Sequence, residues 1–196
     1  MTYLIRTVRA EEWREARVLR LDALRDPAAP LAFLDTYEAA VARPEEHWRE
    51  RTAWSAEGSD TARQFVAVAP DGRWVGSVTS LLERRGAEVL FGEAPEVDQA
   101  HIVGVYLRPE ARGGGVAEKL VETAVDWSWS LSEPVVRRVR LYVHERNARA
   151  AALYRKAGFV PSGRVAVLEG EAGGEDHEYE RWRPDADTGG PEAGER

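Results

Sequence analysis

The amino-acid sequence predicts one domain of the α/β (α+β) class, built on a mixed, mostly antiparallel sheet. Residues 64–82 show a hairpin pattern, in which two apolar stretches flank the turn residues Pro70, Asp71 and Gly72. Residues 101–143 follow the order strand, helix, strand, and a single helical crossover makes the two strands parallel. The chain has 196 residues, 43% of them hydrophobic, with 7 tryptophans, which suits one domain with a sizeable core.

The N-terminal third is expected to form one strand and two helical regions. Residues 3–8 alternate between apolar and polar side chains, which favours a strand. Residues 10–25 carry apolar side chains at helical spacing, and the Asp-Pro pair that follows ends this helix. Residues 30–51 form a second helical region that is broken near Pro44. The aromatic side chains of this region belong either to the core of a helix pair or to a lid.

The middle of the chain leads to a glycine-rich turn. Residues 83–98 are polar and contain Gly and Pro, which predicts a surface loop. The apolar stretch 101–107 predicts a strand, and the glycines at residues 113–115 follow it. From Val116 to Trp127 one helical face is apolar and the other is charged, so we expect this helix to pack on the sheet.

The C-terminal part repeats the order of strand and helix and closes with a hairpin. Residues 135–143 are rich in β-branched side chains, which favours a strand. Asn147 suits a helix N-cap and Gly158 suits the position after a helix, which places a helix between them. Residues 164–168 and 178–182 are expected to pair across an acidic loop.

Residues 184–196 differ in composition from the rest of the chain. They are rich in Asp, Glu, Gly and Pro, show no apolar periodicity, and carry four acids against one arginine. We therefore expect a disordered acidic tail, which leaves residues 1–183 as the domain.

Composition excludes several classes of function. The net charge of −7 argues against general nucleic-acid binding, which needs clustered Lys and Arg. The lack of cysteine excludes disulfides and thiolate metal sites, and no metal-ligand spacing occurs, so we expect no metal. No run approaches the roughly 18 apolar residues of a membrane span, and the N-terminus lacks a secretory signal, so the sequence predicts a cytoplasmic protein that does not bind membranes. Whether the protein forms a homodimer stays open.

The glycines at residues 113–115 predict an anion-binding turn. They carry no Cβ, so the chain can take positive φ and bring backbone N–H groups close to a ligand at the positive end of a helix dipole. A phosphate or pyrophosphate fits such a site. A P-loop is excluded because Lys119 follows Glu118 where that motif needs glycine, and a dinucleotide fingerprint would need a small residue at Glu118. The alternative that the glycines only form a flexible turn, without a ligand, stays open.

Two motifs each follow a predicted strand. The first is Arg112-x-x-Gly115-x-Ala117, and the second is Asn147-x-x-Ala150-x-x-Leu153-Tyr154-x-x-x-Gly158-Phe159. The first resembles motif A of the GNAT-type N-acetyltransferases, and the second resembles the second signature of that family, at the family's distance from the first. The resemblance covers about residues 3–183 and is firmest over 99–160. It implies a single GNAT-type domain, with a sheet of about six or seven strands splayed at a central parallel pair and flanked by about four helices.

The same resemblance assigns residues to acetyl-CoA, the expected co-substrate. Backbone N–H groups of Val105 and Leu107 would bind the thioester and the pantetheine arm. Asn147 and Tyr154 would border the co-substrate from the second signature. The residues that would hold the pyrophosphate are Arg112, Gly113, Gly114, Gly115, Val116 and Ala117.

Tyr154 is the predicted general acid. The departing thiolate must be protonated, and its thiol has a pKa of about 8.5 by analogy with Cys. Tyr154 and Asn147 are two helical turns apart and so share one face, from which a phenol can reach the sulfur. A tyrosine at this position often has that role in the resembling family. The alternative is an aromatic side chain that only packs under Phe159.

His101 is the first candidate for the general base. Histone-type members of the resembling family place a glutamate eleven residues before the motif A arginine, and His101 occupies that position here. An imidazole titrates near neutral pH and can take a proton from an ammonium directly or through water. His144 and then Asp98 are the next candidates. A water chain, with a purely structural histidine, is the alternative.

These features predict an N-acetyltransferase that passes the acetyl group of acetyl-CoA directly to a primary amine within a ternary complex, because no cysteine exists to carry an acetyl-enzyme. The acceptor is a small polyamine-like or aminoglycoside-like cation, or a protein lysine or N-terminus. Acids within residues 31–50 and 169–176 favour a cationic acceptor. The alternative function is a non-catalytic acyl-CoA-binding sensor or regulatory module, which would have a blocked acceptor groove.

Overall fold

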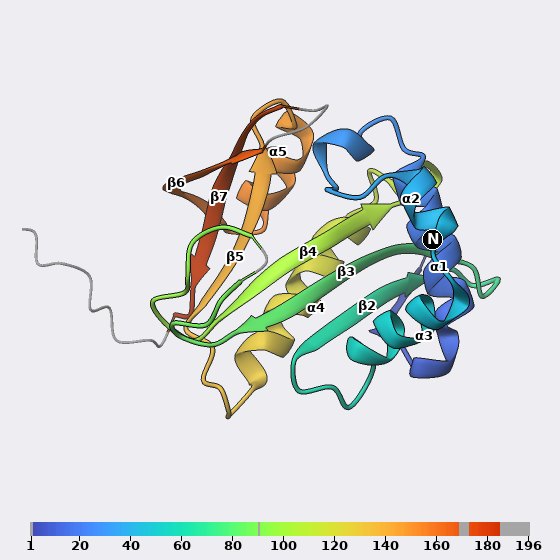
Figure 1. The fold of residues 1–196 in the computed structure, drawn as a ribbon, viewed down its shortest axis with the longest axis horizontal. Helices are drawn as coiled ribbons and strands as arrows, with labels where there is room; N and C mark the ends of the chain where they lie inside the picture. The colour runs from blue at the N-terminus through green and yellow to red at the C-terminus, as the bar shows by residue number, and fades with distance from the viewer. Residues whose placement is uncertain (1, 90, 169–172, 185–196) are drawn as a thin grey trace, which may run out of the picture.

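A seven-stranded mixed sheet organises the molecule (Figure 1). The computed structural model describes residues 2–89, 91–168 and 173–184. The strands are β1 (Leu4–Thr7), β2 (Ala62–Val68), β3 (Trp74–Glu83), β4 (Gln99–Leu107), β5 (Arg138–His144), β6 (Val160–Leu168) and β7 (Gly174–Trp182). They lie in the order β1-β2-β3-β4-β5-β7-β6, and only the β4–β5 pair is parallel.

Five α-helices are described, together with three short 3₁₀ turns. The helices are α1 (Trp13–Leu24), α2 (Tyr37–Ala42), α3 (Glu45–Trp54), α4 (Val116–Ser130) and α5 (Ala148–Lys156). The 3₁₀ turns are η1 (Ala10–Glu12), η2 (Ala29–Leu31) and η3 (Pro109–Ala111). The resemblance implied about four helices, so the N-terminal part is slightly richer in helix than expected.

The sheet opens between β4 and β5. Their parallel pairing joins residues 99–101 to residues 138–140. Beyond these pairs the two strands diverge toward their C-terminal ends, as Figure 1 shows. Main-chain polar groups on that side of β4 therefore have no neighbouring strand to bond.

The two faces of the sheet are covered differently. Helices α4 and α5 cover one face, and the main core beneath them buries Leu120, Val139 and Phe159. Helices α1 to α3 pack over β1, β2 and β3 on the other face, where Leu19 and Trp48 are buried. The remainder of that second face carries charged and polar side chains from β3, β4, β5 and β7, and it borders the opening of the sheet.

The predicted order of elements is confirmed. The β2–β3 hairpin and the parallel β4–β5 pair form as predicted. Region 30–51 contains η2, α2 and α3, with Pro44 at the N-cap of α3. Of the two alternatives for its aromatic side chains, core packing holds for Trp48, which is buried.

Two loop boundaries were predicted wrongly. Glu83 was assigned to the surface loop 83–98, but it is the last residue of β3 and is buried. The closing hairpin is longer than predicted, because β6 begins at Val160 and β7 at Gly174. In both cases pairing with a distant strand extends the element, for example Glu83 with Gln99 and Asp176 with His144.

The expected acidic tail lies outside the described residues, except for Pro184. The domain boundary at residue 183 therefore stays a prediction. Within the described ranges, no helix has the length and apolar character needed to cross a membrane. The same ranges contain no group of three or more His, Asp or Glu side chains placed to hold a metal ion.

Candidate functional site

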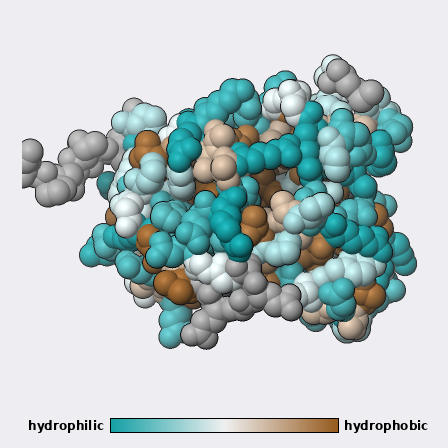
Figure 2. All heavy atoms as spheres, turned by 90° about the horizontal axis from the view of Figure 1, so that it is seen from above, coloured by the Kyte–Doolittle hydropathy of each residue, from teal (hydrophilic) through white to brown (hydrophobic). Residues whose placement is uncertain are grey.

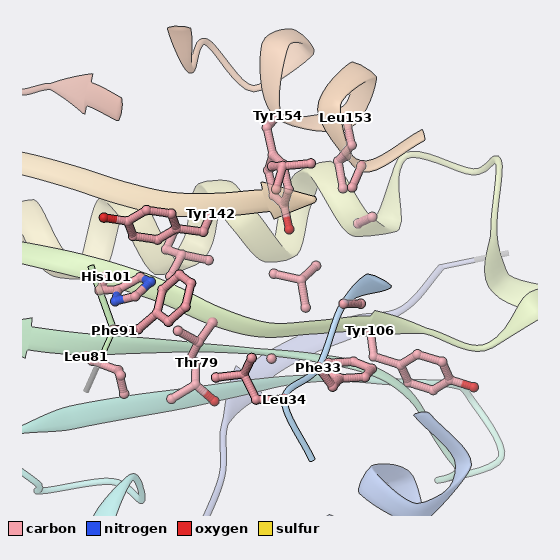
Figure 3. Close-up of a pocket in the computed structure, with 18 of the residues that line it drawn as sticks. Phe33, Leu34, Thr79, Leu81, Phe91, His101, Tyr106, Tyr142, Leu153 and Tyr154 are labelled. Atoms are coloured by element: carbon pink, nitrogen blue, oxygen red, sulfur yellow. The ribbon is translucent and has the colours of Figure 1, made fainter. Parts of the chain in front are cut away.

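A cavity of about 1250 Å³ lies at the opening of the sheet. Its walls come from the α1–α3 region, from β3, β4 and β5, from the start of α4 and from α5 (Figure 3). Figure 2 views the molecule from above Figure 1 and shows a largely hydrophilic surface with apolar residues near its centre. The cavity is lined by every residue that the sequence assigned to the site, with the exception of Gly114.

The glycine turn, residues 113–115, forms the start of α4. Gly113 has φ +82° and Gly115, the N-cap of α4, has φ +77°, both in the left-handed region that favours glycine. A Cβ added at Gly113 or Gly114 would meet no atom within 4 Å, and one at Gly115 would meet only the Glu118 carboxylate at 3.9 Å. The glycines therefore border open space rather than protein, and their N–H groups lie at the positive end of the α4 dipole.

The Arg112 side chain is turned toward the protein. Its Nε donates to the carbonyl oxygen of Leu107 at 2.8 Å, and one terminal nitrogen pairs with the Asp26 carboxylate. Burial opposes the charge of Asp26, but hydrogen bonds from the Ala28 N–H and from Arg112 lower its pKa. The guanidinium of Arg112 thus ties the glycine turn to the loop after α1, which fixes the turn in place.

The end of β4 is shaped by a bulge at Gly104. The pairing of β3 with β4 shifts between Ser77 and Thr79, and Gly104 takes φ +64°. Val105 and Leu107 follow the bulge, in the stretch of β4 that diverges from β5. Their main chain lines the cavity, in the region where the sequence placed the donors for the thioester and the pantetheine arm.

Tyr154 combines packing with access to the cavity. Its ring packs edge-on against Phe159, with 6.2 Å between the ring centroids, and the residue is buried. Figure 3 shows its hydroxyl directed into the cavity, toward β4. Burial raises the pKa of the phenol above its ordinary value, so it stays protonated. The hydroxyl has no hydrogen-bond partner among the described residues, which leaves the proton available to a bound group.

Asn147 acts on the structure of α5. Its side-chain oxygen accepts a hydrogen bond from the Ala150 N–H at 3.1 Å, which caps the helix. Asn147 also lines the cavity. The cap holds the first turn of α5 and so helps to set the position of Tyr154 two turns later.

His101 is buried against Glu83 at the point where β4 and β5 begin to diverge. Its Nδ1 lies 3.0 Å from the Glu83 carboxylate, and its ring packs edge-on against Tyr142 (Figure 3). A carboxylate accepts hydrogen bonds only, so it holds the proton of the neutral imidazole on Nδ1 and leaves Nε2 as the acceptor. This is the arrangement that a general base requires, and His101 lines the cavity.

The charge of Glu83 is stabilised by three donors. Beside His101, the side chains of Gln99 and Arg140 bond the second carboxylate oxygen at 2.6 and 2.9 Å. Arg140 continues the network to Glu178, which also accepts from the Tyr142 hydroxyl at 2.8 Å. Burial works against the Glu83 charge, but the hydrogen bonds from His101, Arg140 and Gln99 lower its pKa from 4.5 to about 2.

We expect Glu83→Gln to change the acid stability of the fold. Because the folded-state pKa is depressed, Glu83 stabilises the fold above about pH 4.5, and this contribution is lost as the pH falls toward about 2. The shift corresponds to about 3 kcal/mol of unfolding free energy. Urea unfolding measures the difference in unfolding free energy between the wild type and the variant. This difference should be largest at neutral pH and should narrow toward pH 2, and a difference independent of pH would contradict the assignment. Glu88→Gln, at an exposed position, is the control.

The other two base candidates are held in structural contacts. His144 is buried, its Nε2 donates to the Gly173 carbonyl at 2.8 Å, and its Nδ1 accepts from the Arg146 N–H at 3.1 Å. Asp98 accepts from the Arg85 N–H at 2.9 Å. Neither side chain lines the cavity. The geometry thus favours His101 over both.

Several residues at the cavity escaped prediction. Glu83 was missed because its partner His101 lies eighteen positions away and meets it only through strand pairing. Asp176 lines the cavity with its Oδ1 buried and without a partner among the described residues, and burial raises its pKa. The only sequence signal for Glu83 was its alternation with Thr79 and Leu81 along β3, which puts all three on one face.

Known proteins with similar sequences are acetyltransferases. The chain is 31% identical over 115 residues to the peptidyl-lysine N-acetyltransferase YjaB of Salmonella typhimurium, a match that covers 59% of this chain and 67% of that protein. It is 35% identical over 101 residues to the mycothiol acetyltransferase of Salinispora arenicola, where the match covers 51% of this chain but only 29% of that longer protein.

Known structures share the fold. One is NAA60 of Arabidopsis thaliana in complex with acetyl-CoA, with a TM-score of 0.66 at 18% identity, covering 92% of this chain and 98% of that one. At this identity the likeness concerns the fold alone. A model of the Acetyltransferase (GNAT) family matches residues 22–159, which include β4, the glycine turn, α4, β5 and α5. The chain therefore belongs to the Acetyltransferase (GNAT) family.

Proposed function

We propose that this acetyltransferase transfers the acetyl group of acetyl-CoA to a primary amine, with both substrates bound at once. The observation that carries the proposal is the single cavity that reaches from the glycine turn past Tyr154 to the His101–Glu83 pair. Family membership supports an acyl-CoA donor, and a protein of the same fold is known in complex with acetyl-CoA. A cytoplasmic location and a homodimer remain predictions.

The glycine turn suits the pyrophosphate of the donor. Gly113 and Gly115 border open space, so a phosphate can approach their N–H groups without meeting a side chain. From there the unpaired side of β4 at Val105 and Leu107 offers main-chain groups that would hold the pantetheine arm. These donors are fixed by the fold and need no particular side chain.

The acceptor amine would be activated by His101. Nε2 takes a proton from the ammonium, directly or through one water, while Glu83 stabilises the resulting imidazolium. The neutral nitrogen then forms a C–N bond with the acetyl carbon, and the C–S bond breaks. The electron pair of that bond leaves on the thiolate of CoA, which receives a hydrogen bond from Tyr154. The attacking nitrogen loses its second proton to solvent, which gives the neutral amide, and the thiolate takes a proton from solvent to give free CoA thiol.

The expected effect of Tyr154→Phe is a kcat lowered about tenfold, which is less than the roughly 10²- to 10⁴-fold usual for general acid catalysis. The effect is modest because the raised pKa keeps Tyr154 protonated, and so able to donate a hydrogen bond, but makes it a reluctant proton donor to a thiolate. Phenylalanine keeps the packing on Phe159, so affinity for acetyl-CoA should not change. Steady-state kinetics and calorimetric titration with acetyl-CoA check this. A kcat equal to that of the wild type would remove Tyr154 from the mechanism.

An amine panel tests the proposed function. Release of free CoA thiol is followed with acetyl-CoA and lysine peptides, peptides with a free N-terminus, polyamines and small amino compounds. Thiol release that depends on an amine, with the acetylated product identified by mass spectrometry, supports the transferase. A sensor would bind acetyl-CoA without turnover over the whole panel, and such a result would overturn the proposal.

A further inference from the structure

Three arginines line the part of the cavity that lies under the N-terminal helices. Arg20 comes from α1, Arg43 follows α2, and Arg51 comes from α3; together they form what we call the basic wall. One acid lies among them. Asp35 accepts two hydrogen bonds from Arg43, at 2.7 and 2.9 Å, and lies 3.8 Å from Arg20. Three cations against one carboxylate leave two positive charges without a partner charge in the wall.

Arg20 is poorly satisfied for a largely buried cation, and Arg51 is an exposed cation that lines the cavity. The Arg20 side chain is 17% exposed, and its Nε is buried without a hydrogen-bond partner. The Arg51 side chain forms no hydrogen bond or ion pair with any described residue. Burial, reinforced by the charges of Arg51 and Arg43, lowers the pKa of Arg20 to about 10, against the opposing effect of Asp35. Both guanidiniums stay charged at neutral pH, and the incompletely compensated charge of Arg20 is costly to bury unless a ligand pairs with it.

The surroundings of the basic wall supply further hydrogen-bonding groups. Gln64 on β2 and Thr79 on β3 are paired in register and line the same cavity, and Phe33 packs against the Arg20 guanidinium at 4.4 Å. Arg20, Arg51, Gln64 and Thr79 also share a smaller hollow of about 30 Å³, which places the arginines beside these polar residues. Guanidinium, amide and hydroxyl groups together match an anionic group such as a carboxylate or a phosphate.

The basic wall lies close to the candidate base along β3. Thr79 is on the same face as Leu81 and Glu83, and Leu81 pairs with His101. Two residues along a strand advance about 7 Å. A small acceptor could therefore place one end at the basic wall and the other at His101.

We infer that the acceptor is an amine that also bears an anionic group, which the basic wall binds while the amine faces His101. This inference rests on the proposed function and names its substrate class. It differs from the cationic acceptor that the acids of residues 31–50 favoured, because two of those acids, Asp35 and Glu45, are paired with Arg43 and Arg49. A polyamine would meet net positive charge at this wall.

Matched amines test the inference. Thiol release is measured with 6-aminohexanoate, its carboxamide, 5-aminopentylphosphonate and spermidine. We expect kcat/KM for the carboxylate or the phosphonate to exceed that for the carboxamide by about tenfold or more, through KM, since charged hydrogen bonds contribute about 1.5–3 kcal/mol. The better of the two anions identifies which group the acceptor carries. Equal values for acid and amide, or a preference for spermidine, would overturn the inference and leave the transferase intact.

Arginine variants assign the preference to the basic wall. Arg51→Gln should abolish it with little loss of stability, because the Arg51 side chain is exposed and forms no hydrogen bond or ion pair with any described residue, whereas Arg51→Lys should keep part of it. Arg49→Gln, on the same helix but ion-paired with Glu45 outside the cavity, is the matched control. If no amine is acetylated, the proposed function fails. In that case, calorimetric titration of the protein with 6-aminohexanoate and with 5-aminopentylphosphonate, in the presence of CoA, still tests whether the basic wall binds an anionic group. Binding that Arg51→Gln removes supports the wall, and no binding in the wild type overturns it.

Discussion

Replacing His101 by glutamine is expected to lower kcat by about 10²- to 10⁴-fold, the usual contribution of a general base. Of the three candidate bases, only His101 both lines the cavity and has its Nδ1 hydrogen-bonded to a carboxylate, that of Glu83. This bond leaves Nε2 to accept a proton. Glutamine can still donate to Glu83, so the buried network should survive. Single-turnover rates with saturating acetyl-CoA measure the loss at the chemical step.

The pH profile separates a base from a structural histidine. With His101 as the base, the dependence of kcat/KM on pH should differ between the wild type and His101→Gln, while affinity for acetyl-CoA stays unchanged. His177→Gln is the matched control, because His177 has a half-exposed side chain and lies outside the cavity lining. A variant that keeps the full rate and the full pH profile would show that a water chain, without His101, removes the proton.

Gly115→Val is expected to weaken acetyl-CoA binding by about 100-fold or more, because it acts on the anion site in two ways. A valine side chain would fill the open space that Gly115 borders, where the pyrophosphate is proposed to bind. It would also strain a backbone with φ +77°, at a cost of about 1–2 kcal/mol. Calorimetric titration with acetyl-CoA and with CoA gives the loss of affinity directly.

A second glycine separates these two effects. Gly72, in the β2–β3 turn, has φ +84° and no atom within 4 Å of an added Cβ, so Gly72→Val carries the same backbone strain at a position outside the cavity lining. We expect Gly72→Val to lower the melting temperature as much as Gly115→Val does, but to bind acetyl-CoA like the wild type. Unchanged affinity in Gly115→Val would refute the assignment of the pyrophosphate to this turn.

Local sequence patterns were enough for the parts of the site that lie close together in the chain. The glycine turn, the strand before it and the helix after it are contiguous, so spacing and the positive φ of glycine predict them without tertiary information. The same holds for α5, whose N-cap Asn147 and inward-facing Tyr154 follow from helical periodicity.

Charge was the property that local patterns predicted least well. Glu83 looked like the first residue of a polar loop, and no local pattern marked Arg20 and Arg51 as residues that line the cavity. Local sequence patterns do not show whether a charged side chain is buried, and an arginine at a polar helix position is usually exposed. The expectation of a cationic acceptor rested on acids counted along the chain, whereas the structure pairs Asp35 with arginines from α1 and from the end of α2.

The sequence by itself thus determined the family, the order of the elements and the anion-binding turn, because these depend on contiguous motifs and on backbone geometry. Only the tertiary structure decided which charges are buried and which are paired. The pairing of β3 with β4 brings Glu83 to His101, and the packing of α1 and α3 over the sheet directs Arg20 and Arg51 into the cavity. Electrostatic energy depends on distance and desolvation, and both are set by contacts between segments far apart in the chain.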